Sequence, residues 1–398
     1  MKRLNGKKIL LGITGCIAAY KAAELVRFWV KNGADVKVVM THSAQKFISP
    51  LTFETLIGSE VLTELFTEKK YQATVHIDLA DWADVLVIAP ASANIISKIR
   101  MGLGDDLLST IALAGWKKTV IAPSMNSNMW ANPAVQENIS ELKKRGYLII
   151  DPEEGELACG YTGLGRLADI TTIDYWIQYY LNPRTNLKNK TVLITAGRTE
   201  EEIDPVRIIT NRSSGKMGFA LAKEAFYRGA HVILVSGPNI LPLLPGIEYH
   251  QITSAREMEK CVTNSFNKAD IAIASAAVTD YHAKSIAKQK IKRTNNAMQL
   301  DLVANPDILL QLGKMKKNMI LVGFALETEN EEKNALEKLK KKNLDMIIMN
   351  NPFNKESGFA MDTNKVKIFT AKGEKLDVPL QEKSEIAAKI LDEIEKLL

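Results

Sequence analysis

The amino-acid sequence predicts an α/β protein of two domains, each built on a parallel sheet with helices on both faces. The chain has 398 residues, and one domain usually holds about 100–200. Short β-rich apolar runs alternate with segments of helical period, which is the pattern of a doubly wound sheet. The pattern lapses in a polar, proline-containing segment at residues 181–190 and then starts again. These three observations place the domain boundary close to the midpoint.

The first half, residues 1–180, alternates strands and helices from its beginning. Gly33 and Gly146 follow two helical segments, at positions where a residue that tolerates positive φ is favoured. The expected strands are Ile9–Ile13, Asp35–Met40, Val85–Ala89 and Thr119–Ala122, and the clearest expected helices are Ile17–Asn32 and Pro133–Arg145.

Residues 181–190 are expected to form a linker, and residues 191–398 a second α/β domain. Both halves open with a strand, a glycine-containing turn and a helix, but they share no repeat at the level of residues. The second βαβ series is expected to place strands at Thr191–Thr195, His231–Val235, Asp270–Ala274, Met319–Phe324, Asp345–Met349 and Lys365–Phe369, with helices at Phe219–Arg228 and within Ser254–Asn267.

Composition excludes several classes of protein. Hydrophobic residues make up 46% and charged residues 25% of the chain, a balance typical of globular proteins. The longest uncharged stretches are broken by Pro, Gly and Asn, and no apolar signal core follows Met1, so we expect a cytoplasmic protein without membrane spans. Cys16, Cys159 and Cys261 are far apart, which argues against a disulfide framework or a structural zinc site.

The net charge of +6 is unevenly distributed. Residues 1–180 hold 19 basic and 19 acidic side chains, whereas residues 181–398 hold 33 and 27. A solvated surface would explain the basic excess, and so would an anionic ligand such as a polyphosphate. The basic half contains no sequence feature that indicates nucleic-acid binding.

Three loops of the first half are candidates for ligand binding. The turn from Gly12 to Gly15 leads from a strand into a helix, whose N-terminal N–H groups can seat an anion, although packing alone can also require glycines there. Pro90–Lys98 and Pro123–Trp130 follow the third and fourth strands. Because ligands of open α/β sheets bind at the carboxyl ends of strands, a site is expected at this edge.

At these loops the first half resembles the flavin-dependent cysteine decarboxylases, since residues 123–130, PSMNSNMW, match their PxMNxxMW motif. The whole chain resembles the bacterial bifunctional phosphopantothenoylcysteine decarboxylase/phosphopantothenate–cysteine ligases. The resemblance implies a flavodoxin-like, Rossmann-like domain that uses FMN to convert 4'-phospho-N-pantothenoylcysteine to 4'-phosphopantetheine through an enethiol. The implied FMN contacts are Gly12, Gly15, Cys16, Ser43, Ser92, Asn94 and Met125.

The resemblance also implies roles in catalysis. His76 would move or orient the substrate proton, although a lone histidine can equally be structural, and Asn126 would bind the substrate carboxylate beside Met129. Cys159 would protonate the enethiol. The segment Cys159–Arg166 has so many glycines that we expect a mobile flap rather than a regular helix or strand. The family usually has glycine at the position of Cys16, and we expect no chemistry from this thiol.

In the second half, Asn211–Gly218 leads into a helix but fits neither the GxxxxGK[ST] nor the GxGxxG phosphate-binding pattern. It resembles the ligase motif NxSSGKMG, and Ile203–Arg207 resembles IDPVR. The resemblance implies a Rossmann-like domain in which CTP and Mg2+ activate 4'-phosphopantothenate as an acyl-cytidylate before cysteine forms the amide. Asn211 and Lys290 would be catalytic, and no metal ligands are assigned. The implied substrate contacts are Asp280, Asn305, Pro306, Asp307, Ile308, Phe324, Lys338 and Lys342.

Some expectations stay open at the level of sequence. Arg198, Glu200 and Glu202 replace Pro, Arg and Pro of the family pattern, which leaves the contacts to phosphopantothenate undecided. Lys338 and Lys342 would otherwise be a solvated helix end. The family implies a homo-oligomer, with trimers of the flavin domain and dimers of the ligase domain in assemblies up to a dodecamer.

Two other functions compete with the bifunctional enzyme. One is a flavin decarboxylase that acts on a peptide C-terminal cysteine and is fused to an inactive nucleotide domain, which the ligase motifs disfavour. The other is a non-catalytic redox sensor that binds flavin and nucleotide. Such a sensor would not need His76, Asn126 and Cys159 together.

Overall fold

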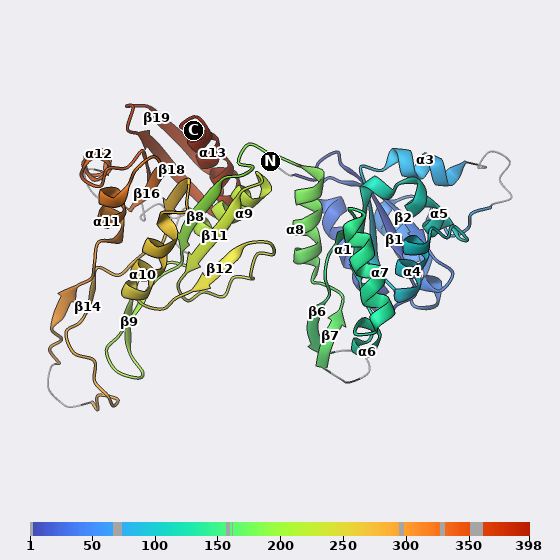
Figure 1. The fold of residues 1–398 in the computed structure, drawn as a ribbon, viewed down its shortest axis with the longest axis horizontal. Helices are drawn as coiled ribbons and strands as arrows, with labels where there is room; N and C mark the ends of the chain where they lie inside the picture. Colours follow the sequence, from blue (N-terminus) through green and yellow to red (C-terminus); the bar gives the residue numbers. More distant parts are fainter. Residues whose placement is uncertain are drawn as a thin grey trace. The chain divides into compact units, whose positions relative to one another are not determined.

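A computed structural model describes residues 3–66, 74–156, 160, 162–293, 298–326, 331–350 and 361–398. The chain forms two compact units, Met1–Asn182 and Pro183–Leu398 (Figure 1). Each unit contains a sheet with its own buried core. None of the described helices is long and apolar enough to cross a membrane.

The first unit is built on a five-stranded parallel sheet of order β2-β1-β3-β4-β5. Its central strands are buried on both faces and are therefore apolar throughout, as parallel strands covered by helices must be. The strands are β1 (Lys8–Ile13), β2 (Asp35–Met40), β3 (Val85–Ala91), β4 (Thr119–Pro123) and β5 (Leu148–Ile149). The four strands predicted from the sequence are confirmed, and the two-residue β5 was too short to be recognised.

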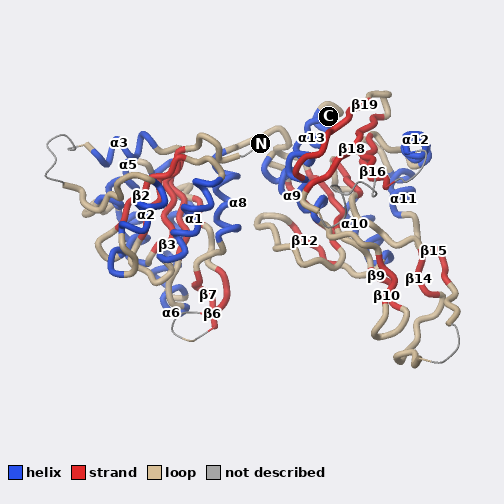
Figure 2. The backbone as a smooth tube through the Cα atoms, turned by 180° about the vertical axis from the view of Figure 1, so that it is seen from behind, coloured by secondary structure: helices blue, strands red, loops and turns tan. Residues whose placement is uncertain are grey.

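Helices cover both faces of this sheet (Figures 1 and 2). In α1, the buried side chains Ala19, Ala22, Leu25, Val26 and Trp29 recur at helical spacing, which is why this segment forms an amphipathic helix. One core contains α1 (Ala19–Lys31), α2 (Pro50–Ile57) and α8 (Ile170–Leu181), and the other contains α3 (Val75–Trp82), α4 (Ala93–Met101), α5 (Leu107–Ala114) and α7 (Pro133–Lys144), with the short α6 (Ser127–Trp130) beyond β4.

The glycine-rich segment before α8 is more regular than expected. Thr162–Arg166 forms strand β7, which pairs antiparallel with β6 (Glu153–Glu156), so the prediction that no strand forms here was wrong. A Cβ on Gly165 would lie 2.3 Å from the Met125 carbonyl oxygen, and one on Gly163 would lie 3.0 Å from Ser127 Cβ. These glycines therefore let the hairpin pack closely on the loop after β4.

The second unit contains an eight-stranded sheet of order β12-β11-β8-β13-β16-β17-β18-β19. The strands are β8 (Thr191–Ala196), β11 (His231–Ser236), β12 (Glu248–Gln251), β13 (Ile271–Ala274), β16 (Ile320–Leu326), β17 (Met346–Asn350), β18 (Thr363–Thr370) and β19 (Lys375–Glu382). The sheet is parallel through β17, but β18 and β19 are antiparallel. Lys365–Phe369 is a strand as predicted, yet it does not continue the βαβ series, because β18 pairs antiparallel with β17.

Two layers of helices cover this sheet. One core includes α9 (Lys216–Tyr227) and α13 (Lys383–Glu395), and the other includes α10 (Ala255–Phe266), α11 (Ile308–Met315) and α12 (Glu331–Lys341). The fully buried Arg228 joins the first two helices through Glu224, Asp392 and Glu395, at 2.9, 2.8 and 2.7 Å. A charge can be buried here because three carboxylates surround it.

Two small hairpins project from the second unit. They are β9 (Glu200–Glu202) with β10 (Ile208–Thr210), and β14 (Tyr281–Ala283) with β15 (Leu302–Ala304). Both extend away from the large sheet in the same direction (Figures 1 and 2). We name the segment from β14 to β15, residues 281–304, the arm.

Candidate active sites

The first candidate site lies where the chain changes direction in the sheet of the first unit. Strand β1 pairs with β2 on one side and β3 on the other, so the loops after β1 and β3 flank the position where open α/β sheets bind ligands. Thr14 joins these loops, since its Oγ1 donates to the Pro90 carbonyl oxygen at 2.7 Å and accepts from the Ser92 N–H at 2.9 Å. The residues that follow these two strands and are predicted to contact FMN therefore lie at the same edge of the sheet.

The glycines of the β1 turn are required by packing. A Cβ on Gly12 would lie 2.4 Å from Leu108 Cδ1, and one on Gly15 would lie 2.4 Å from Ser43 Cβ. Packing therefore accounts for both glycines. Helix α4, which begins after Ser92, has no side-chain cap, so its first N–H groups remain for a ligand. Helix α1 also lacks a side-chain cap, but the N–H groups of Ala19 and Lys21 donate to the carbonyl oxygens of Cys16 and Ala18, at 2.9 and 3.0 Å.

Polar residues of the β4 loop complete this edge. Cys16 Sγ donates to Ser124 Oγ at 3.4 Å, which connects the β1 turn to the β4 loop. Asn126 begins α6, and its Oδ1 accepts from the Asn128 N–H at 2.8 Å. Met125 is buried, whereas Met129, Ser43 and Asn94 are exposed.

The predicted catalytic residues of the first unit are not all brought together. His76 lies on α3, at the opposite end of the unit from α6 and the β6–β7 hairpin (Figures 1 and 2). Its Nδ1 is buried and has no hydrogen-bond partner among the described residues. Cys159 lies outside the described residues. Within one chain, therefore, His76 and Asn126 do not share a site.

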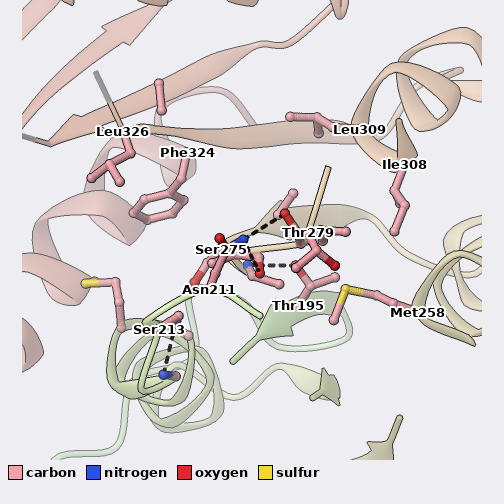
Figure 3. Close-up of a pocket in the computed structure, with 18 of the residues that line it drawn as sticks. Thr195, Asn211, Ser213, Met258, Ser275, Thr279, Ile308, Leu309, Phe324 and Leu326 are labelled. Carbon is pink, nitrogen blue, oxygen red and sulfur yellow. Dashed lines mark hydrogen bonds between the residues drawn. The ribbon is translucent and has the colours of Figure 1, made fainter. Parts of the chain in front are cut away.

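The second unit contains a cavity of about 500 Å³ at the carboxyl edge of its sheet. The neighbouring strands β8 and β13 lead to opposite sides of the sheet, which is again the position where open α/β sheets bind ligands. The cavity is lined by Thr195, Asn211, residues 213–218, Met258, residues 274–280, residues 305–309, Leu312, residues 324–326, Lys338, Lys342, Asn350, Asn364 and Lys383. Figure 3 shows Ser213 and Ile308 on opposite sides, with Asn211, Thr195 and Thr279 between them.

All the predicted substrate contacts of the second unit line this cavity, and so does Asn211. The amide of Asn211 is oriented by two backbone acceptors, the carbonyl oxygens of Ala277 and Val278, at 3.1 and 3.0 Å from Nδ2. Its N–H groups are therefore engaged by the protein. Its Oδ1 is the atom that can accept from a ligand.

A buried polar network holds the loop after β13. Thr279 N–H donates to Thr199 Oγ1 at 2.9 Å, and the Thr279 hydroxyl donates to Glu201 at 3.2 Å. Glu201 also accepts from the N–H of Ala255, the first residue of α10, at 2.8 Å. Asn305 Nδ2 donates to the Thr279 carbonyl at 2.9 Å, while its buried Oδ1 has no partner among the described residues. This network fixes one wall of the cavity.

Lysines at the end of α12 face the same cavity. Lys338 Nζ donates to the Phe324 carbonyl oxygen at 3.0 Å, and Lys342 pairs with Asp307 at 2.8 Å. Burial alone would raise the pKa of Asp307, but the hydrogen bond from Lys342 and the N–H of Leu310 lower it. Lys338 and Lys342 are therefore more than a solvated helix end.

Other predicted residues lie elsewhere, and some lining residues were not anticipated. Lys290 is exposed on the arm and does not line the cavity. Lys216, Asn364 and Lys383 do line it, yet only Lys216 lies in a recognised motif. Among the described residues, no group of three or more His, Cys, Asp or Glu is arranged to hold a metal ion.

Comparisons with known proteins follow this division. Residues 1–181 match the family model "Flavoprotein", and residues 187–398 match "DNA/pantothenate metabolism flavoprotein C-terminal domain". The chain is 45% identical over 397 residues to the coenzyme A biosynthesis bifunctional protein CoaBC of Bacillus subtilis (strain 168), with 99% of this chain and 98% of that protein covered. The Escherichia coli (strain K12) protein of the same name is 42% identical over 395 residues, with 98% and 97% covered.

A solved structure, the C-terminal domain of coenzyme A biosynthesis bifunctional protein CoaBC, is 40% identical to this chain. It covers 54% of this chain and 97% of its own length, with a TM-score of 0.47.

Proposed function

The chain belongs to the family of coenzyme A biosynthesis bifunctional proteins, and we propose that it joins 4'-phosphopantothenate to cysteine with CTP and then decarboxylates the product with FMN. The second unit is the ligase, and the first is the flavin-dependent decarboxylase. The product of the two steps is 4'-phosphopantetheine.

One observation carries the ligase assignment. Asn211, Asp280, residues 305–308, Phe324, Lys338 and Lys342, which were nominated by motif resemblance alone, all line one cavity. These residues come from segments spread over more than a hundred positions of the chain. A cavity at the switch point of the sheet is where a nucleotide would be expected.

The residues present suit acyl activation. The carboxylate of 4'-phosphopantothenate attacks the α-phosphorus of CTP and pyrophosphate leaves. The amine of cysteine then attacks the acyl carbon, and CMP leaves. Lys338 and Lys342 would offset phosphate charge. Mg2+ would be held mainly by substrate phosphates, and Asp280 is a carboxylate of the cavity that makes no ion pair with the described residues.

This edge of the first unit suits FMN. The N-terminus of α4, which has no side-chain cap, lies at this edge, and such termini bind phosphate groups. When bound, FMN supplies reversible oxidation and reduction of the substrate. Asn126 would hold the substrate carboxylate, His76 would handle the proton, and Cys159 would protonate the enethiol.

We further propose that His76 and Lys290 act in neighbouring copies of the chain. His76 lies away from the Asn126 loop, and Lys290 lies on the arm outside the cavity. Apolar side chains are exposed next to His76 in the sequence and on the arm, with Ile77 42% and Tyr281 53% exposed. Association of copies through these surfaces would cover apolar area and bring each residue to a site.

Pyrophosphate release tests the ligase assignment. With CTP, Mg2+, 4'-phosphopantothenate and cysteine, the wild-type chain should release pyrophosphate only when the acid is present. Lys342→Met should lower kcat/KM by about tenfold or more, because one charged contact to the substrate is lost. Lys341→Met removes an exposed lysine one position away and should have little effect. Equal activity of the two variants would refute the assignment.

A further inference from the structure

Cationic side chains border the ligase cavity on both faces of the sheet. Lys338 and Lys342 belong to the face covered by α10, α11 and α12. Lys216 and Lys383, the first residues of α9 and α13, belong to the other face. The substrate contacts implied by the family resemblance account for the first pair only.

A buried amide accompanies the second pair. Asn364 is only 3% exposed and lines the cavity. Its Oδ1 accepts from the Lys365 N–H at 2.9 Å, and its Nδ2 donates to none of the described residues. Because Asn364 lines the cavity, this donor is available to an acceptor on a ligand.

The surroundings of Asn364 favour an anion. Lys383 N–H donates to the Asp362 carbonyl, and Lys383 Nζ donates to the Met361 carbonyl. Lys216 pairs with Asp362 at 2.7 Å. Burial lowers the pKa of Lys383, and the nearby charge of Lys216 lowers it further. A bound anion would stabilise both charged lysines. In addition, α9 begins at Gly215 without a side-chain cap, so its first N–H groups can also bind an anion.

We propose that Lys216, Lys383, Asn364 and the first turn of α9 form a phosphate subsite, and that it holds the phosphate of 4'-phosphopantothenate. This inference rests on the proposed ligase function. Both 4'-phosphopantothenate and CTP carry phosphoryl groups, so each substrate must be assigned to one end of the cavity. The apolar side chains Ile308 and Leu309 suit a nucleoside and lie across the cavity from Ser213 (Figure 3). They follow Asp307, which pairs with Lys342 at 2.8 Å.

The position of the reacting carboxylate then determines how 4'-phosphopantothenate is oriented in the cavity. Its reacting carboxylate must meet the α-phosphate of CTP near Asn211, which lies in the middle of the cavity (Figure 3). The phosphate is at the other end of the acid. It therefore extends away from the nucleotide, toward Ser213 and the start of α9.

Asn364→Asp is the sharpest test. Aspartate keeps the acceptor for the Lys365 N–H but replaces the free donor by a negative charge that repels phosphate. The KM for 4'-phosphopantothenate should rise by about tenfold or more, and the KM for CTP should not change. Pantothenate, which lacks the phosphate, should be used equally poorly by wild type and variant.

Lys383→Met provides an independent variant, and Lys365→Met is its control. Lys383→Met should also raise the KM for the phosphorylated acid selectively. Lys365 is exposed on the same strand as Asn364 and does not line the cavity, so its loss should leave both KM values unchanged. Thermal unfolding of each variant identifies any effect that is due to misfolding.

The outcomes separate this inference from the proposed function. If Asn364→Asp and Lys383→Met raise the KM for CTP instead, the subsite binds the nucleotide and the proposal is wrong. Unchanged KM values in both folded variants would also refute it. If the wild-type chain releases no pyrophosphate with CTP and the acid, the proposed function itself fails.

Discussion

At the scale of single residues, the ligase cavity depends on side chains whose hydrogen bonds are already committed to the protein. Asn211 uses its amide nitrogen on two backbone carbonyls, and Glu201 accepts from both α10 and Thr279. Such groups orient their neighbours before substrate arrives, so less conformational freedom is lost on binding. Lys383 also donates to the protein, at the Met361 carbonyl. Burial and the charge of Lys216 nevertheless lower its pKa, although the charge of Asp362 acts in the opposite direction.

This lowered pKa gives a pH dependence. A lysine binds phosphate in its protonated form, and a lowered pKa means that Lys383 loses its proton at a lower pH than an ordinary lysine. The KM for 4'-phosphopantothenate should therefore rise with increasing pH below about 10.4, the usual lysine value. Steady-state kinetics across the alkaline range measures this. In Lys383→Arg, which stays charged, the rise should disappear, and its persistence would exclude Lys383 as the titrating group.

At the scale of elements, contacts distant in sequence hold the sites in place. The α9 and α13 helices are joined by Arg228, and the β6–β7 hairpin packs on the β4 loop through glycines. Substitution of Arg228 or of the hairpin glycines would disturb this packing. Because α9 and α13 supply Lys216 and Lys383, the first arrangement also shapes the cavity.

Arg228→Ala should lower the free energy of unfolding of the ligase unit by about 3–5 kcal/mol, because the buried Glu224 carboxylate loses the partner that lies 2.9 Å away. Denaturant unfolding of the full chain measures this loss. Arg184→Ala removes a 45% exposed arginine, 3.7 Å from the same Glu224, and should cost less than about 1 kcal/mol. A similar loss in both variants would show that burial does not set the contribution of Arg228.

Gly165→Ala should impair decarboxylation while leaving pyrophosphate release unchanged. Its Cβ would lie 2.3 Å from the Met125 carbonyl, at a φ of +144°, so the hairpin must move off the Asn126 loop. Separate assays of CO2 and pyrophosphate measure the two activities. Gly58→Ala has a positive φ but nothing within 4 Å of its Cβ, and it controls for backbone strain alone. Normal decarboxylation by Gly165→Ala would contradict a role for the close packing.

At the scale of the whole molecule, His76 and Lys290 lie away from the residues with which we propose that they act. Symmetric association would give each copy the same new contacts. Under this proposal, catalysis in both units depends on the oligomeric state.

Mixed oligomers test this connection. Lys290→Gln and Asn211→Ala should each be inactive as ligases, because each lacks one residue per site. If Lys290 acts in a second copy, each hybrid dimer of the two variants has one intact site out of two. Random mixing makes about half of the dimers hybrids, so about one quarter of wild-type activity should be recovered. Co-expression with two affinity tags provides the hybrids. An inactive hybrid would place Lys290 in its own chain or outside the reaction.

Much of this architecture could be predicted from the sequence, because strands such as Ile9–Ile13 are apolar throughout and alternate with helices. The hairpin at Thr162–Arg166 could not, since its glycines indicate flexibility unless the neighbouring Met125 loop is known. Asn364 and Lys383 were missed for a similar reason. They lie far along the chain from the motifs, and only the pairing of β18 with β17 and the packing of α13 on the sheet bring them to the cavity.

The central claim is that one chain performs both reactions in sequence. The most direct measurement supplies the purified chain with FMN, CTP, Mg2+, 4'-phosphopantothenate and cysteine, and quantifies pyrophosphate, CO2 and 4'-phosphopantetheine together. We predict that all three form in equal amounts once the intermediate has been consumed. Pyrophosphate without CO2 would contradict the decarboxylase assignment, and the absence of both would contradict the account as a whole.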